Sequence, residues 1–138
     1  MKIVINTCYG GFGLSEKVIQ EYFNLKGWTL YTEKNEIDWV PTYWKVPVED
    51  RVKEIDWKNS TPKEIEEYNR KYIEQTFYND DVERTDSDLI RAIEIVGTEE
   101  ASGKYASLKI VEIPDDVEWE LGEYDGREWV AEKHRTWR

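Results

Sequence analysis

The sequence is poor in the residues that form disulfides, metal sites and membrane spans. Its 138 residues include one Cys, one His and one Met. One Cys cannot form an internal disulfide, and one Cys with one His falls short of a metal ligand set. No stretch approaches the roughly 20 apolar residues that span a bilayer, and the opening residues do not read as a signal peptide. We therefore expect a cytosolic protein with no cofactor, no metal and no membrane partner.

Aromatic and charged side chains are abundant instead. Seven Trp and nine Tyr are spread along the chain, and their apolar area allows a sequence that is 36% charged to fold. The net charge of −11 opposes direct binding of DNA, RNA or anionic membranes. The charge is uneven: residues 21–125 carry 27 acidic and 13 basic side chains, whereas residues 1–20 and 126–138 are net positive.

Local patterns predict a mixed α+β fold in a single domain, residues 1–138. It should contain a small sheet, with an N-terminal strand and a C-terminal β-hairpin, packed by about three helices. The predicted strands are 2–6, 28–31 and 107–113, the helices are 16–26, 61–76 and 85–96, and the hairpin strands are 117–124 and 127–133.

Turn and cap residues fix most of these boundaries. Ser15 is a good N-cap, and Gly27 follows the same helix as a C′ residue. Thr61-Pro62-Lys63-Glu64 is a complete helix start, and Asp125-Gly126 is a strong hairpin signal. Residues 39–47 alternate apolar and polar side chains but contain prolines, so we interpret them as an edge strand or an ordered aromatic loop.

The segment Tyr9-Gly10-Gly11-Phe12-Gly13-Leu14-Ser15 lies between the first strand and the first helix. Its glycines allow close approach to a ligand, and the helix N-terminus behind them favours an anion. Tyr9 or Phe12 could stack on a base. Neither a dinucleotide nor a P-loop fingerprint is present. The alternative is a tight strand-to-helix turn with Phe12 packed in the core.

The C-terminal residues Lys133-His134-Arg135-Thr136-Trp137-Arg138 interleave cations with an aromatic ring, which suits phosphates and a stacked base. The alternative is a solvated chain end. Cys8 and His134 could form a thiolate–imidazole nucleophile, but no third orienting group is indicated, and a small core Cys is the more common case. We therefore predict no catalytic residues.

The chain resembles a family of small proteins of tailed bacteriophages and prophages. The residues that carry the resemblance are 2–6, 9–15, 68–76, 84–89 and 124–137. That family typically has prolines around residues 84–89, where this chain has Glu83 and Ser87. The resemblance implies a phage accessory protein in the host bacterial cytoplasm that acts against host defence. It indicates this biological context rather than any particular chemistry.

These observations predict a protein that sequesters a small phosphorylated, nucleotide-derived ligand, an immune signal of the host, as a homodimer or higher homo-oligomer. The alternative is an acidic interaction module that mimics nucleic acid or blocks a host factor. The predicted ligand-binding residues are Asn6, Tyr9, Gly10, Gly11, Phe12, Gly13, Ser15, Gln75, Tyr78, Arg84, His134, Arg135 and Trp137.

Overall fold

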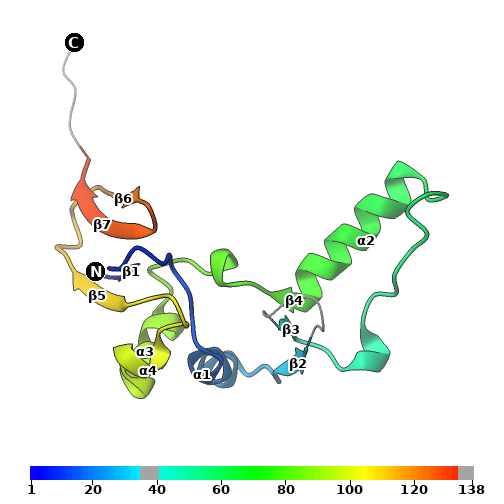
Figure 1. The fold of residues 1–138 in the computed structure, drawn as a ribbon, viewed down its shortest axis with the longest axis horizontal. Coiled ribbons are helices and arrows are strands. Elements are labelled where there is room, and N and C mark those ends of the chain that lie inside the picture. Colours follow the sequence, from blue (N-terminus) through cyan, green and yellow to red (C-terminus); the bar gives the residue numbers. More distant parts are fainter. Residues whose placement is uncertain (35–40, 134–138) are drawn as a thin grey trace, which may run out of the picture. The chain divides into compact units, whose positions relative to one another are not determined.

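The computed structural model describes residues 1–34 and 41–133 (Figure 1). Its contacts divide the chain into two compact units, one formed by residues 1–26 with 82–138 and the other by residues 27–81. We describe each unit by itself. The predicted α+β class is confirmed. None of the helices in the described ranges is long and apolar enough to cross a membrane.

The first unit is built on the antiparallel pair β1 (Lys2–Asn6) and β5 (Leu108–Glu112), in which Asn6 faces Leu108. This pair lies between three helices and the β-hairpin (Figure 1). The helices are α1 (Glu16–Lys26), α3 (Ser87–Val96) and α4 (Thr98–Ala101). The predicted strand 107–113 is therefore confirmed to within a residue at each end, while α4 was not predicted.

The core of this unit joins β1 to α1 and α3. Ile3, Val4, Val18, Phe23 and Leu89 have essentially no exposed surface. The helical spacing that places Val18 and Phe23 on one face of α1 explains why this helix packs on α3.

The predicted helix boundaries of the first unit are largely correct. The Ser15 Oγ accepts a hydrogen bond from the Val18 N–H at 3.2 Å, and Gly27 follows α1 with a φ of +76°. Helix α3 was predicted to start with Thr85 as its N-cap, but it starts one residue later. Asp86 is the N-cap, because its carboxylate accepts from the N–H groups of Asp88 and Leu89.

The C-terminal hairpin consists of β6 (Trp119–Tyr124) and β7 (Arg127–Glu132). Asp125 and Gly126 both have positive φ, at 50° and 88°, as a type I′ turn requires. The predicted C-terminal hairpin is therefore confirmed. It forms its own two-stranded ladder, and the Glu128 side chain of β7 accepts from the Asn6 N–H of β1.

The second unit contains a small sheet and one long helix. The sheet order is β2 (Tyr31–Glu33), β3 (Thr42–Trp44), β4 (Thr76–Phe77), and short 3-10 turns cover Val48–Asp50 and Asn79–Asp81. The edge-strand interpretation of residues 39–47 is wrong for the part described, residues 41–47. β3 is the central strand, because Pro41 and Pro47 flank it and leave its N–H groups free to pair.

Helix α2 (Pro62–Gln75) confirms the predicted N-cap, since the Thr61 side chain accepts from the Glu64 N–H and Pro62 is the first helical residue. None of its residues is fully buried. The buried residues of this unit, in its described part, are Trp44, Thr76 and Phe77. Its apolar contacts therefore include rings that are partly exposed. The ring centres of Trp57 and Tyr68, for example, lie 5.1 Å apart.

Candidate functional site

The glycine-rich turn of residues 9–13 lies against two other segments of the first unit. A Cβ at Gly10 would overlap the carbonyl oxygen of Tyr105, and the Gly103 N–H donates to the Gly13 carbonyl at 2.9 Å. At Gly126, in the hairpin turn, a Cβ would lie 2.6 Å from the Gly11 nitrogen. Close approach between protein segments therefore accounts for Gly10. A Cβ at Gly13 would make only ordinary contacts at 3.9 Å, and a Cβ at Gly11, whose φ is +94°, would meet no atom within 4 Å.

Asn6 joins these segments from the end of β1. Its side chain is fully buried, and its amide nitrogen donates to the carbonyls of Cys8 and Gly126, both at 2.7 Å. Its amide oxygen accepts from the Ser107 N–H at 2.8 Å. Asn6 was predicted to contact a ligand, but every polar atom of its side chain already has a protein partner.

Arg84 is held over Phe12 by Glu128. The guanidinium donates to both Glu128 carboxylate oxygens, at 2.5 and 2.8 Å, and its carbon lies 3.6 Å from the centre of the Phe12 ring. The Glu128 side chain is 7% exposed and that of Arg84 is 20% exposed. Such a bidentate, stacked arrangement suits the planar guanidinium.

This ion pair also completes the free edge of β1. The Val4 N–H donates to the Arg84 carbonyl at 2.9 Å, and the Asn6 N–H donates to the Glu128 Oε1 at 2.8 Å. A buried strand cannot leave these groups unpaired without a large energetic cost. The two positions therefore have a structural role that the sequence did not reveal.

Two exposed tyrosines, Tyr9 in the turn and Tyr105 in the segment packed against it, each have a cation over the ring. The Arg127 guanidinium lies 6.0 Å from the centre of the Tyr9 ring, and the Lys104 ammonium lies 5.4 Å from that of Tyr105. Tyr9 is 61% exposed and Tyr105 is 70% exposed. In the described ranges, neither cation has a carboxylate within ion-pairing distance. Arg127, Lys104 and Tyr105 were missed by the sequence analysis.

The side chains of Ser15 and Cys8, at the two ends of this region, form hydrogen bonds with other residues of the protein. The Ser15 hydroxyl donates to the Glu100 carbonyl at 2.7 Å in addition to capping α1. The Cys8 thiol lies 3.1 Å from the Tyr105 carbonyl oxygen and 3.3 Å from the Asn6 Oδ1. These contacts suit a thiol that acts as a weak hydrogen-bond donor.

Of the remaining predicted site residues, two belong to the second unit and three are outside the described residues. Gln75 and Tyr78 belong to the second unit, where the Gln75 side chain binds the Val52 N–H and the Asp50 carbonyl. The Tyr78 hydroxyl bonds that of Tyr72 at 3.1 Å. His134, Arg135 and Trp137 lie outside the described residues, so the predicted C-terminal half of the site stays a prediction.

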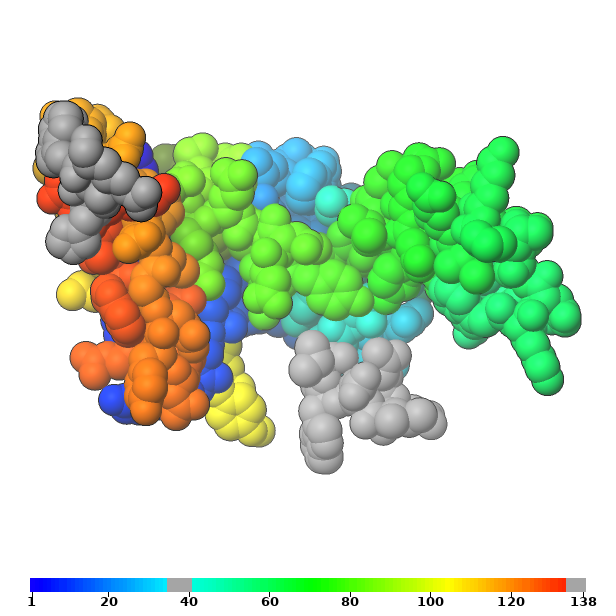
Figure 2. All heavy atoms as spheres, turned by 90° about the horizontal axis from the view of Figure 1, so that it is seen from above, coloured from blue at the N-terminus to red at the C-terminus, as the bar shows by residue number. Residues whose placement is uncertain are grey.

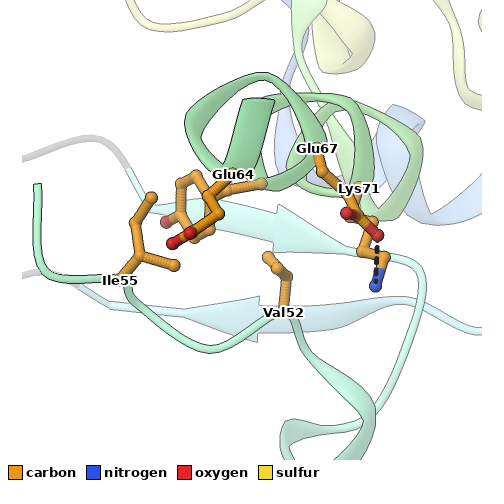
Figure 3. Close-up of a pocket in the computed structure, with 6 residues that line it drawn as sticks. Val52, Ile55, Glu64, Glu67 and Lys71 are labelled. Atoms are coloured by element: carbon orange, nitrogen blue, oxygen red, sulfur yellow. Dashed lines mark ion pairs between the residues drawn. The ribbon is translucent and has the colours of Figure 1, made fainter. Parts of the chain in front are cut away.

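The second unit has an open hollow of about 280 Å³ beside α2 (Figure 3). Ile55 and Val52 face Glu64, Glu67 and Lys71 across it, and the Glu67 and Lys71 side chains are paired at 3.5 Å. Because its one cation is already paired, this hollow offers an anionic ligand no free positive group.

Ionisable groups in the first unit are perturbed at the start of α3, where Tyr22, Lys26 and Asp86 meet. Burial, then the Asp86 charge, raises the pKa of Tyr22 to about 12. Burial opposes ionisation of Asp86, but the Leu89 N–H, Lys26 and the Asp88 N–H together lower its pKa. These groups cap and tie helices. Within residues 1–34 and 41–133, no three His, Cys, Asp or Glu side chains are grouped to hold a metal ion.

Comparison with protein-family models, with curated proteins and with solved structures gives no match.

Proposed function

We propose that this protein binds a small phosphorylated, nucleotide-derived ligand at the glycine-rich turn and holds it without chemical conversion. The observation that carries the proposal is the pair of exposed cation–tyrosine contacts, Arg127 with Tyr9 and Lys104 with Tyr105, on the two segments that flank the turn. Within the described ranges neither cation has an ion-pair partner, and both lie beside exposed rings in a chain of net charge −11.

Each partner in this site has a defined task. Arg127 and Lys104 pair with phosphate oxygens, and Arg127 can do so with two parallel hydrogen bonds. Tyr9 presents a ring on which a base stacks. Short-range contacts of this kind outweigh the net negative charge, which salt screens over about 8 Å.

The biological setting of the proposal rests on the resemblance to phage proteins. In that setting the chain is an accessory protein that sequesters an immune signal in the host bacterial cytoplasm, as a homo-oligomer. The C-terminal cations, His134 and Arg135, would add to the same site.

Isothermal titration calorimetry with AMP, ADP-ribose and cyclic di-AMP tests the proposal. We expect one of these ligands to bind, and we expect Arg127→Gln and Tyr9→Ala each to weaken binding about tenfold. Arg91→Gln is the matched control, because Arg91 is an exposed cation on α3. Recovery of intact ligand after heat denaturation distinguishes a sequestering protein from a hydrolase. Binding by none of the ligands contradicts the proposal.

A second candidate function is an acidic protein-interaction module. The observation that favours it is the charge of residues 112–132, which include nine acidic side chains and one basic one. Of the nine, Asp115 pairs with the N-terminal ammonium group and Glu128 with Arg84. A host factor with a basic surface would be its target.

A further inference from the structure

The outward face of the hairpin carries two large aromatic side chains. Cross-strand pairing places Gly122 opposite Trp129 and Tyr124 opposite Arg127, and side chains alternate along each strand. Glu120, Tyr124, Arg127 and Trp129 therefore share one face, opposite the face on which Glu128 reaches Asn6. Tyr124 is 71% exposed and Trp129 is 46% exposed. Figure 2 shows the hairpin, in orange to red, at the surface.

Trp129 is held in place although it is half exposed. A Cβ at Gly122 would overlap the indole of Trp129, so the ring lies directly over the glycine backbone. Glycine weakens a strand interior, and its presence often marks a close approach. Here it lets a half-exposed indole pack against the hairpin backbone. An indole that is already held in place loses less conformational entropy when a partner binds.

The surroundings of these rings are strongly acidic. Glu120 lies on their face, and Glu118 and Asp125 flank β6. In the described part of the chain none of these three has a cation within ion-pairing distance. Aromatic faces attract Lys and Arg side chains, and nearby carboxylates add to that attraction. The same charge repels a second copy of this hairpin and any nucleic acid.

From this geometry we infer that the outward face of β6 and β7 is a docking surface for a basic segment of another protein. An Arg or Lys side chain of that partner lies on the Trp129 and Tyr124 rings, and its charge is met by Glu120. Charge complementarity identifies the occupant, and the fixed Trp129 provides the central contact. This inference rests on the second candidate function, the acidic interaction module, and gives it a binding face. The face adjoins the proposed nucleotide site, because Arg127, opposite Tyr124, belongs to that site.

Fluorescence anisotropy with a labelled peptide of alternating Arg and Val residues tests the inference on the full chain. We expect binding that weakens about tenfold between about 50 mM and about 300 mM NaCl, and no binding of the peptide with Glu in place of Arg. Tyr124→Ala and Glu120→Gln should each weaken binding several-fold. Both residues are exposed, so the fold should be retained, which a thermal melt verifies.

Trp129→Ala should weaken binding most, and Trp57→Ala is the matched control. Trp57 is 47% exposed but belongs to the second unit, so its loss should leave binding unchanged. If the Trp129→Ala and Tyr124→Ala variants bind the peptide as tightly as wild type, the peptide is attracted only to the overall negative charge, and the inference is overturned. Failure of the peptide to bind would also overturn it, as would sedimentation velocity showing that wild type self-associates and the Tyr124 variant does not.

Discussion

Arg84 and Glu128 lie 44 residues apart in the chain and form a two-point ion pair at 2.5 and 2.8 Å. The carboxylate also accepts from the Asn6 N–H, and the guanidinium covers the Phe12 ring. One contact therefore connects the first strand, the glycine-rich turn and the C-terminal hairpin. Because the exposed Tyr9 and Arg127 belong to the turn and the hairpin, this ion pair positions the proposed ligand site.

Glu128→Ala should lower the free energy of unfolding by about 3 kcal/mol, because it leaves the partly buried Arg84 and the Asn6 N–H without a partner. Urea denaturation measures the loss. Arg84→Ala and the double variant complete the cycle, and the double variant should lose well under the sum of the two single losses. Losses that add to within about 0.5 kcal/mol would show that the two groups act independently.

Gly126→Ala should destabilise the protein by about 2 kcal/mol or more, because its Cβ would meet the Gly11 nitrogen at 2.6 Å and its φ is +88°. Gly27→Ala is the matched control: its φ is +76°, but a Cβ there meets no atom within 4 Å. The control should cost about 1 kcal/mol. Equal thermal stability of the two variants would contradict the close packing of hairpin and turn.

Asn6→Ala should cost about 2–3 kcal/mol, since it removes buried hydrogen bonds to Cys8, Gly126 and Ser107. Asn24→Ala, on the exposed face of α1, should change stability by less than about 0.5 kcal/mol. Chemical denaturation of both variants makes the comparison. If Asn6→Ala lowers the free energy of unfolding no more than Asn24→Ala does, water replaces the lost hydrogen bonds and the predicted structural role of Asn6 is contradicted.

Stability should depend on the ionisation of Asp86 at acid pH. Its pKa is lower in the folded chain than the ordinary 3.8, so its charged form stabilises the fold above pH 3.8, and this contribution is lost as the pH falls through the folded value. Asp86→Asn cannot titrate. The stability difference between wild type and Asp86→Asn, from urea denaturation, should therefore shrink below pH 3.8. A difference that stays constant would exclude this linkage.

The sequence was sufficient where structure depends on neighbouring residues. Ser15, Thr61 and Asp125-Gly126 mark caps and a turn through short-range chemistry, and each prediction is confirmed. The edge-strand interpretation of residues 39–47 was wrong in the described part, because β3 pairs with a strand on each side and one of these, β4, is distant in the sequence. The prolines in this segment carry no information about which strands pair with it.

The site was harder to predict because the same residue types serve a ligand and a fold. Asn6 and Arg84 were singled out as polar groups near a glycine-rich turn, yet their partners are Gly126 and Glu128, over 40 residues away. Arg127 had a usable signal: it follows a two-residue turn, which places it at the hairpin end. Its contact with Tyr9 depends on packing between remote segments.

The central claim is that the exposed side of the glycine-rich turn and the hairpin end bind a nucleotide. Backbone amide shifts in ¹⁵N-labelled protein, titrated with the nucleotide that binds in calorimetry, test it most directly. We predict that the largest shifts fall at Tyr9, Gly11, Lys104, Tyr105 and Arg127, and that Arg127→Gln needs about tenfold more nucleotide to produce them. Shifts confined to residues 41–81, or none at saturating nucleotide, would contradict the claim.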